Sequence, residues 1–193
     1  MIFKENTELN ELYFLKEGKV KLHKSTKEKT EHIIRFSNTD ELLGIETIIA
    51  GGNHLYSATA LKDLYLCRIS KGEFYELMLE KPGLYYCLLN ALSCILHEMN
   101  NRNFSILQKS ELERLAEALI ILQTKYNIEE IKLLKKDLAN YTNIGKNQIK
   151  FYLNCLKKER LISFNSERIK IINLQELQLV ADGQHNVDLR SAS

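Results

Sequence analysis

The sequence has no tryptophan, one proline and only eight glycines among its 193 residues. It contains no glycine-rich nucleotide loop, no zinc-protease motif and no serine-hydrolase motif, so we expect no enzyme. It has no run of 18 or more apolar residues, which argues against a membrane-spanning helix. The amino terminus lacks the charged and then apolar order of a secretory signal. We therefore expect a cytoplasmic protein that does not interact with a membrane.

Cysteine is also sparse and unpatterned. The four cysteines are Cys67, Cys87, Cys94 and Cys155, and none lies in a C-x-x-C pair. Zinc sites and disulfide frameworks both need cysteines at recurring close spacings. We therefore predict neither a metal site nor a disulfide framework.

What the sequence does have is a strong asymmetry of charge. Residues 1–131 carry 16 basic and 19 acidic side chains, whereas residues 132–170 carry ten basic and three acidic ones. A segment with this excess of positive charge suits a polyanion such as nucleic acid. Charge alone would equally describe a solvated basic surface, so the spacing of the residues has to decide between the two.

Short strand patterns dominate the first 70 residues. They lie at residues 12–15, 20–23, 32–36, 58–61 and 64–69, with turn residues such as Gly18, Gly51 and Gly52 between them. Several short strands at intervals near ten residues indicate an antiparallel sandwich or barrel. We predict an all-β amino-terminal domain.

A long helix is predicted to start at Pro82, because proline suits the first turn of a helix. Its apolar residues recur in steps of three and four, like a coiled-coil seam. This apolar seam could instead pack on the chain's own β-domain. However, Tyr86, Leu89 and Leu96 give the helix a second apolar side, so that it can pack on the β-domain and on a partner helix. We therefore expect a homodimer. The predicted interface residues are Leu88, Leu92, Ile95, Met99 and Ile106.

Residues 132–162 carry the pattern of a helix-turn-helix. After an amphipathic helix at about 111–126, two short helical patterns at 136–141 and 146–156 are joined by four residues that include Asn143 and Gly145. In the second pattern Ile149 repeats at helical spacing with other apolar residues and should face the core. The exposed side chains near the start of this pattern are then hydrogen-bond donors. The start of a recognition helix is the part that reaches the base edges.

Two further strand patterns, 161–164 and 168–172, follow as a two-stranded wing whose basic side chains suit phosphate. A protein-binding role for such a winged element is the alternative. The predicted DNA contacts are Lys135, Thr142, Gly145, Lys146, Asn147, Gln148, Lys150, Phe151, Arg168 and Lys170.

These segments, in this order, resemble the cyclic-AMP receptor and fumarate-nitrate regulator (CRP/FNR) family of bacterial transcription factors. The resemblance rests on residues 13–22, 57–61, 138–139 and 156–162. It implies an α+β fold with a sensor β-roll (1–80), a dimerisation helix (81–109) and a winged helix-turn-helix (110–180). It also implies double-stranded DNA and RNA polymerase as partners. Residues 181–193 lack periodicity, and we predict a flexible tail there.

The departures from the family concern the effector. Nucleotide-binding members carry a Gly-Glu pair and an Arg-Ser pair, but here Gly44 is followed by Ile45 and Ser57 is preceded by Tyr56. A buried phosphate without its arginine is poorly compensated, so we expect no tight cyclic-AMP binding. No cysteine precedes Cys67, so we expect no iron-sulfur cluster. Haem or another small effector stays open, and we predict no cofactor.

The candidate effector pocket comprises Gly44, Glu46, His54, Tyr56 and Ser57, which could equally be ordinary loop residues. We expect a dimeric regulator that reads an inverted-repeat operator with residues 145–157 and is modulated through the β-roll by a signal other than cyclic AMP. Two alternatives are a ligand-independent regulator and a small-molecule-binding module that regulates a protein partner.

Overall fold

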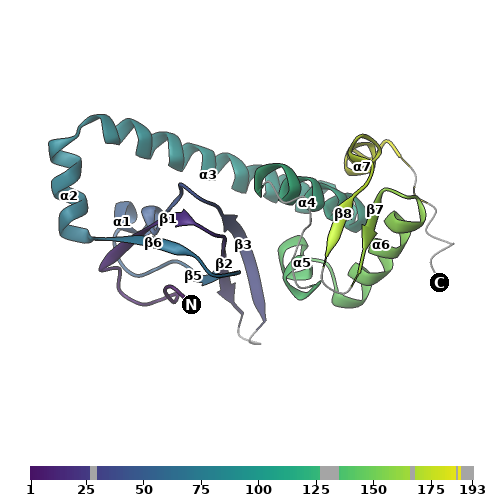
Figure 1. Ribbon diagram of the computed structural model, residues 1–193, viewed down its shortest axis with the longest axis horizontal. Helices are drawn as coiled ribbons and strands as arrows, with labels where there is room; N and C mark the ends of the chain where they lie inside the picture. The colour runs from purple at the N-terminus through teal and green to yellow at the C-terminus, as the bar shows by residue number, and fades with distance from the viewer. Residues whose placement is uncertain (27–29, 127–134, 166–167, 186, 188–193) are drawn as a thin grey trace. The chain divides into compact units, whose positions relative to one another are not determined.

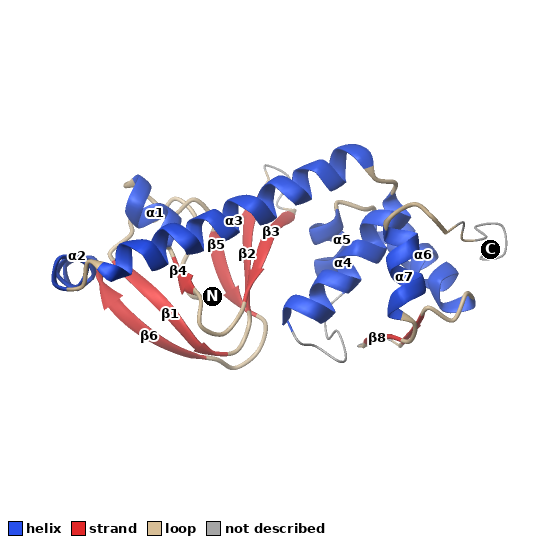
Figure 2. Cartoon of the chain, turned by 90° about the horizontal axis from the view of Figure 1, so that it is seen from above, coloured by secondary structure: helices blue, strands red, loops and turns tan. Residues whose placement is uncertain are grey.

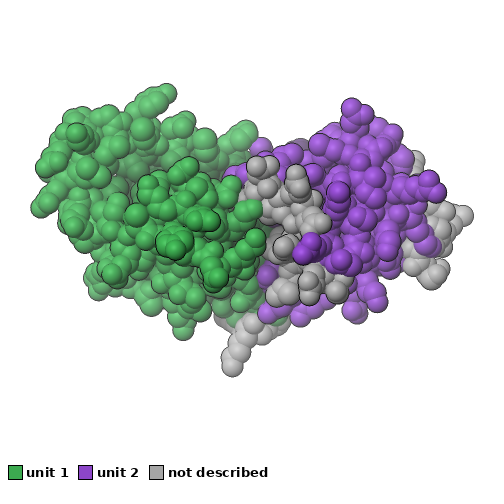
Figure 3. Space-filling view, in the orientation of Figure 1, with its two compact units in different colours: residues 1–100 green, residues 101–193 purple. Residues whose placement is uncertain are grey.

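The computed structural model describes residues 1–26, 30–126, 135–165, 168–185 and 187 (Figure 1). The chain forms two compact units, Met1–Asn100 and Asn101–Ser193, which Figure 3 colours green and purple. The boundary between the units falls inside the long helix α3 (Gly83–Gln108).

The first unit is built on two antiparallel sheets, ordered β4-β1-β6 and β3-β2-β5. Its elements are β1 (Glu11–Glu17), β2 (Val20–Ser25), β3 (Glu31–Ser37), β4 (Leu42–Leu43), α1 (Ile45–Ala50), β5 (Ser57–Ala60), β6 (Tyr65–Ser70) and α2 (Lys71–Glu80). The predicted antiparallel β-domain is therefore confirmed. The short elements β4, α1 and α2 were not expected from the sequence.

Alternation along the strands creates the core of this unit. Leu15, Leu22 and Leu43 come from different strands and are completely buried in one cluster. Successive strand residues point to opposite faces, so Val20 and Leu22 of β2 are buried and the intervening Lys21 is only partly buried. The turn after β1 needs Gly18, whose φ is +110° and whose added Cβ would lie 2.5 Å from the Cβ of Leu64.

A second apolar cluster joins the strands to the helices, with Figure 2 showing α1 and α2 beside the strands. It contains Leu12, Ile48, Phe74 and other buried side chains, and Leu88 of α3 packs against it. α2 begins with a capping box, in which Ser70 and Glu73 exchange side-chain hydrogen bonds with each other's backbone N–H groups. Apolar burial and capping together explain why this stretch is helical.

The second unit contains α4 (Glu111–Tyr126), α5 (Lys135–Thr142), α6 (Lys146–Lys158), β7 (Ile162–Phe164), β8 (Ile169–Ile171) and α7 (Leu174–Ala181). β7 and β8 form an antiparallel pair. Leu119, Leu153 and Leu177, from three different helices, are completely buried. The predicted α+β architecture, with a β-domain, a long helix and a helical region carrying a small hairpin, is confirmed.

α7 was not expected. Its start is capped by Asn173, whose side chain accepts a hydrogen bond of 3.1 Å from the N–H of Glu176. The N–H groups of Gly183 and Gln184 then close the carboxyl end of the helix on the carbonyls of Val180 and Leu179. Most of the predicted flexible tail lies outside the described residues.

Within the described part of the chain, no helix is both long enough and apolar enough to cross a membrane.

Candidate nucleic-acid interface and β-roll site

The turn between α5 and α6 has the geometry of a helix-turn-helix. Asn143 takes the left-handed conformation, with φ of 55°, which asparagine tolerates better than most residues. Ile144 is buried, and its N–H donates to the carbonyl of Ala139 at 3.2 Å. Gly145 then occupies the N-cap position of α6. The chain thus reverses direction in three residues between two packed helices.

α6 has one buried side and one polar side. Its buried residues are Ile149, Leu153, Cys155 and Leu156. The exposed residues near its start are Lys146, Asn147, Gln148 and Lys150, as the apolar spacing predicts. The first turn holds no acidic residue. The positive end of the helix dipole and these hydrogen-bond donors therefore both favour an anion at the start of α6.

Two arginines hold the carboxyl end of α5. Arg114 of α4 donates from Nε to the carbonyl of Thr142 at 3.2 Å and from Nη2 to the carbonyl of Asn143 at 3.4 Å. Arg102 of α3 donates to the carbonyl of Tyr141 at 2.8 Å and lies over its ring. Cations at the last carbonyls of a helix are favourable. Neither arginine was predicted from the sequence, because their partners lie about 30 to 40 residues away along the chain.

Not every predicted DNA contact presents its side chain. Thr142 is buried, and its hydroxyl donates to the carbonyl of Leu138 at 2.8 Å, so this side chain stabilises α5 instead of facing outward. Phe151 is half-buried in an edge-to-face contact with Tyr152. The hydroxyl of Tyr152 in turn donates to Glu111 at 3.0 Å. These residues position α6 on α4.

A basic cluster surrounds Phe164 of β7. The ammonium groups of Lys135 and Lys157 lie 5.5 and 5.3 Å from the centre of its ring. Arg168 and Lys170, at and beyond the hairpin turn, are both exposed. Lys157 was not among the predicted contacts, although a lysine in the last turn of a basic helix could have indicated a phosphate contact.

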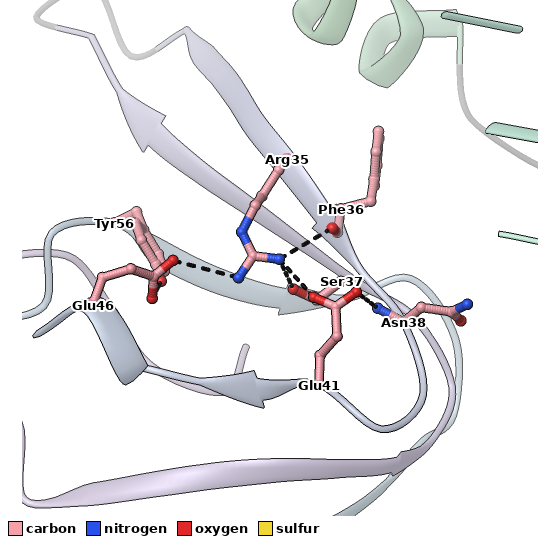
Figure 4. Close-up of polar contacts among 7 residues, drawn as sticks. All are labelled: Arg35, Phe36, Ser37, Asn38, Glu41, Glu46 and Tyr56. Carbon is pink, nitrogen blue, oxygen red and sulfur yellow. Dashed lines mark hydrogen bonds and ion pairs between the residues drawn. The ribbon is translucent and has the colours of Figure 1, made fainter. Parts of the chain in front are cut away.

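In the first unit, two of the predicted effector residues, Glu46 and Tyr56, belong to a polar network around Arg35 of β3 (Figure 4). Arg35 is 2% exposed and bonds Glu41 at 2.6 Å and Glu46 at 3.4 Å. It also donates to the hydroxyl of Ser37 at 2.8 Å. The hydroxyl of Tyr56 donates to the other carboxylate oxygen of Glu46. The network thus joins β3, the loop before β4, α1 and the start of β5.

The electrostatics of this network follow from burial and pairing. Burial raises the pKa of Tyr56, and the neighbouring Glu46 carboxylate raises it further. Burial alone would lower the pKa of Arg35, but the carboxylates of Glu46 and Glu41 outweigh that effect and raise it. Arg35 therefore stays charged and Tyr56 stays a proton donor.

Two of the remaining predicted pocket residues, His54 and Ser57, contact the amino-terminal segment. The hydroxyl of Ser57 accepts the N–H of Glu5 at 3.0 Å. The ring of Phe3 stacks on the buried ring of His54, with centroids 3.9 Å apart. Gly44 has φ of +90° and caps α1, and an added Cβ would lie 3.7 Å from the His54 ring. Of the five predicted residues, Glu46 and Tyr56 thus share the network with Arg35, which sequence spacing did not reveal, and His54 and Ser57 contact the segment 3–7.

No group of three or more metal-binding side chains occurs among the described residues.

The long helix α3 has two different apolar sides. Of the predicted interface residues, Leu88 packs against the core of the first unit, and Leu92, Ile95 and Ile106 are half-buried. Met99 is exposed. The other exposed apolar side chains of α3 are Tyr85, Tyr86, Leu89, Leu96, Phe104 and Leu107. The uncovered apolar surface is therefore offset from the predicted seam.

Comparison with known proteins gives consistent matches. Residues 1–81 match the family described as the cyclic nucleotide-binding domain. The chain is 25% identical to the fumarate and nitrate reduction regulatory protein of Vibrio cholerae, over 93% of this chain and 74% of that protein. It is also 25% identical to the protein of the same name from Escherichia coli K12, over 96% of this chain and 77% of that protein.

Solved structures show the same fold. FixK2 from Bradyrhizobium japonicum superposes with a TM-score of 0.83 at 17% identity, covering 93% of this chain and 91% of its own. A transcriptional regulator from Thermus thermophilus superposes with a TM-score of 0.82 at 20% identity, covering 96% of this chain and 95% of its own.

Proposed function

We propose that this chain is a DNA-binding transcription regulator of the CRP/FNR family, with a domain at its amino end that matches the cyclic nucleotide-binding domain, and that it reads an inverted-repeat operator as a homodimer. In this proposal α6 enters the major groove, and the regulator acts with RNA polymerase in the cytoplasm. It is a transcription regulator and not an enzyme, as are the relatives that it matches.

The observation that carries the proposal is the polar side of α6. Lys146, Asn147 and Lys150 are exposed at the start of a helix whose opposite side is fully buried. Lysine donates to the acceptors of guanine, and asparagine pairs with adenine in the major groove. Lys135, Arg168 and Lys170 supply phosphate contacts, which add affinity without sequence information.

Selection from random duplexes, followed by a salt series, tests this proposal. We expect enrichment of an inverted repeat with half-sites about 34 Å apart and an affinity that falls steeply with salt, because phosphate contacts release counterions. Enrichment of a sequence without two-fold symmetry would contradict the proposal that a homodimer binds the operator. Absence of duplex binding at low salt would favour a protein-binding role for the winged element.

Replacing Lys146 with alanine separates base reading from charge. We expect Lys146→Ala to weaken binding to the selected operator by about 1–3 kcal/mol and binding to random duplex by much less. Lys71→Ala is the matched control, since it removes the same charge from an exposed position on α2. Equal losses on both duplexes would instead make Lys146 a phosphate contact.

We propose that the homodimer forms through the uncovered side of α3. Leu89 is 64% exposed, Leu96 60% and the predicted interface residue Met99 42%, and they recur at intervals of seven and three residues on one helix. Intervals of seven and three residues place side chains on one face of a helix, as at the core positions of a coiled coil. A second copy of the same helix is the partner that two-fold symmetry supplies.

A further inference from the structure

We propose that the effector region of this β-roll is occupied by the chain itself, by Arg35 from one side and by the segment 3–7 from the other, so that the regulator binds DNA without a nucleotide effector. The inference rests on the proposed function and specifies how that function is regulated.

Both oxygens of the Glu46 carboxylate already have a partner within the chain. Oε1 bonds the guanidinium of Arg35 at 3.4 Å, and Oε2 accepts the hydroxyl of Tyr56. Both partners come from within the same unit and both are buried. A ribose hydroxyl would therefore compete for this carboxylate with an ion pair and a charge-assisted hydrogen bond, each stronger than a neutral hydrogen bond.

The charge of Arg35 is already compensated. Glu41 and Glu46 both pair with it, and its Nη1 also donates to Ser37 and to the carbonyl of Phe36. An anionic nucleotide would add negative charge beside two carboxylates that share one guanidinium. It could recruit Arg35 only by leaving a half-buried carboxylate without its partner, which is strongly unfavourable.

The second side of the region is closed by the amino-terminal segment. The N–H of Asn6 donates to the carbonyl of His54 at 2.8 Å, and the N–H of His54 donates to the carbonyl of Thr7 at 2.8 Å. Phe3 covers the face of the His54 ring, and the N–H of Glu5 donates to the hydroxyl of Ser57. These contacts follow one another along residues 3–7 and hold this segment against His54 and Ser57.

Direct nucleotide titration is the first test. The intact protein is titrated with cyclic AMP, cyclic GMP and cyclic di-GMP by calorimetry and by thermal melting. We expect no heat of binding and a melting temperature that shifts by less than about 1 °C, whereas a nucleotide at about 100 times its Kd would raise it by about 5 °C or more. A shift of that size with any of the three would overturn the proposal.

The second test measures DNA binding with and without these nucleotides. Protein shown by native mass spectrometry to carry no small molecule should bind the selected operator, and each nucleotide should change that affinity by less than about two-fold. An increase of about ten-fold or more with any of them would overturn ligand independence while leaving the DNA-binding function intact. Failure to bind duplex under every condition would overturn the proposed function, and the titration would still decide whether the region is occupied.

Two sets of variants test the network itself. Tyr56→Phe removes only the hydroxyl that Glu46 accepts, so we expect the melting temperature to fall by about 5 °C. Tyr65→Phe removes a hydroxyl from an exposed ring on β6 and should leave it unchanged. Arg35→Gln and Glu46→Gln should each destabilise the first unit, and the double variant should lose less than the sum of the two. Strict additivity, or a Tyr56→Phe protein as stable as the wild type, would contradict an energetically coupled network.

Discussion

At the scale of single residues, arginines connect elements in both units. Arg35 ties β3 to α1, and Arg114 ties α4 to the turn before α6. An arginine can do this because its planar guanidinium presents five donors in fixed directions. Each one therefore satisfies several oxygen atoms that the folded backbone and side chains bring together.

Replacing Arg114 should loosen the helix-turn-helix. Arg114→Gln leaves the carbonyls of Lys109, Thr142 and Asn143 without their charged donor, so we expect the free energy of unfolding to fall by about 2 kcal/mol in urea titration. Operator affinity should fall with it, because α6 is then less well positioned. Arg68→Gln, which breaks only an exposed pair with Glu11, should cost less than about 0.5 kcal/mol. Equal losses in the two variants would refute the positioning role of Arg114.

His54 should make the first unit sensitive to acid. Burial lowers its pKa below the ordinary value of 6.5, so the unfolded chain takes up a proton that the folded chain resists. This contribution to stability is present above about pH 6.5 and is lost as the pH falls below it. We expect the urea midpoint to fall between about pH 7 and pH 5.5 in the wild type. His54→Phe, which keeps an aromatic ring against Phe3, should show a smaller fall over the same interval.

At the scale of elements, helix ends are set by short local signals. Ser110 and Glu113 form a capping box at the start of α4, as Ser70 and Glu73 do at the start of α2. Each box satisfies two N–H groups that the helix itself leaves unbonded. The S-x-x-E pattern is visible in the sequence, and it could have located the start of α2.

Removing the cap of α4 should have a measurable and local cost. We expect Ser110→Ala to lower the free energy of unfolding of the second unit by about 1 kcal/mol, measured by urea denaturation. Ser93→Ala, at an exposed position inside α3, is the control and should be neutral or slightly stabilising, since alanine favours helix interiors. A Ser110→Ala protein with unchanged stability would show that the box does not determine where α4 starts.

At the scale of the whole molecule, the proposed dimer depends on the uncovered apolar side of α3. Leu89→Glu and Leu96→Glu place a charge on that side, so we expect a monomer in analytical ultracentrifugation and loss of cooperative binding to the inverted repeat. Ile49→Glu alters an equally exposed apolar residue on α1 and should leave the dimer intact. A dimer that survives both α3 substitutions would place the interface elsewhere.

The periodicity of the sequence was enough to predict the local structure. Short strand patterns at intervals near ten residues predicted the strands of the β-roll, and helical spacing predicted residues 111–126 as a helix, which is where α4 lies. The side of α6 that faces the core follows from the same spacing, because Ile149 and Leu153 can be buried together only on one face. Charge counting then located the basic segment.

The sequence by itself thus determined the order of the main elements, from the β-domain through the long helix to the helix-turn-helix, and the polar side of α6, since these depend on neighbouring residues. Only the tertiary structure decided which side of α3 is covered, because both sides are apolar and the β-roll core contacts just one. It also turned Thr142 inward and gathered Arg35, Glu46 and Tyr56 into one network. The contacts of that network join different strands, loops and helices, so no single periodic pattern in the sequence reveals them.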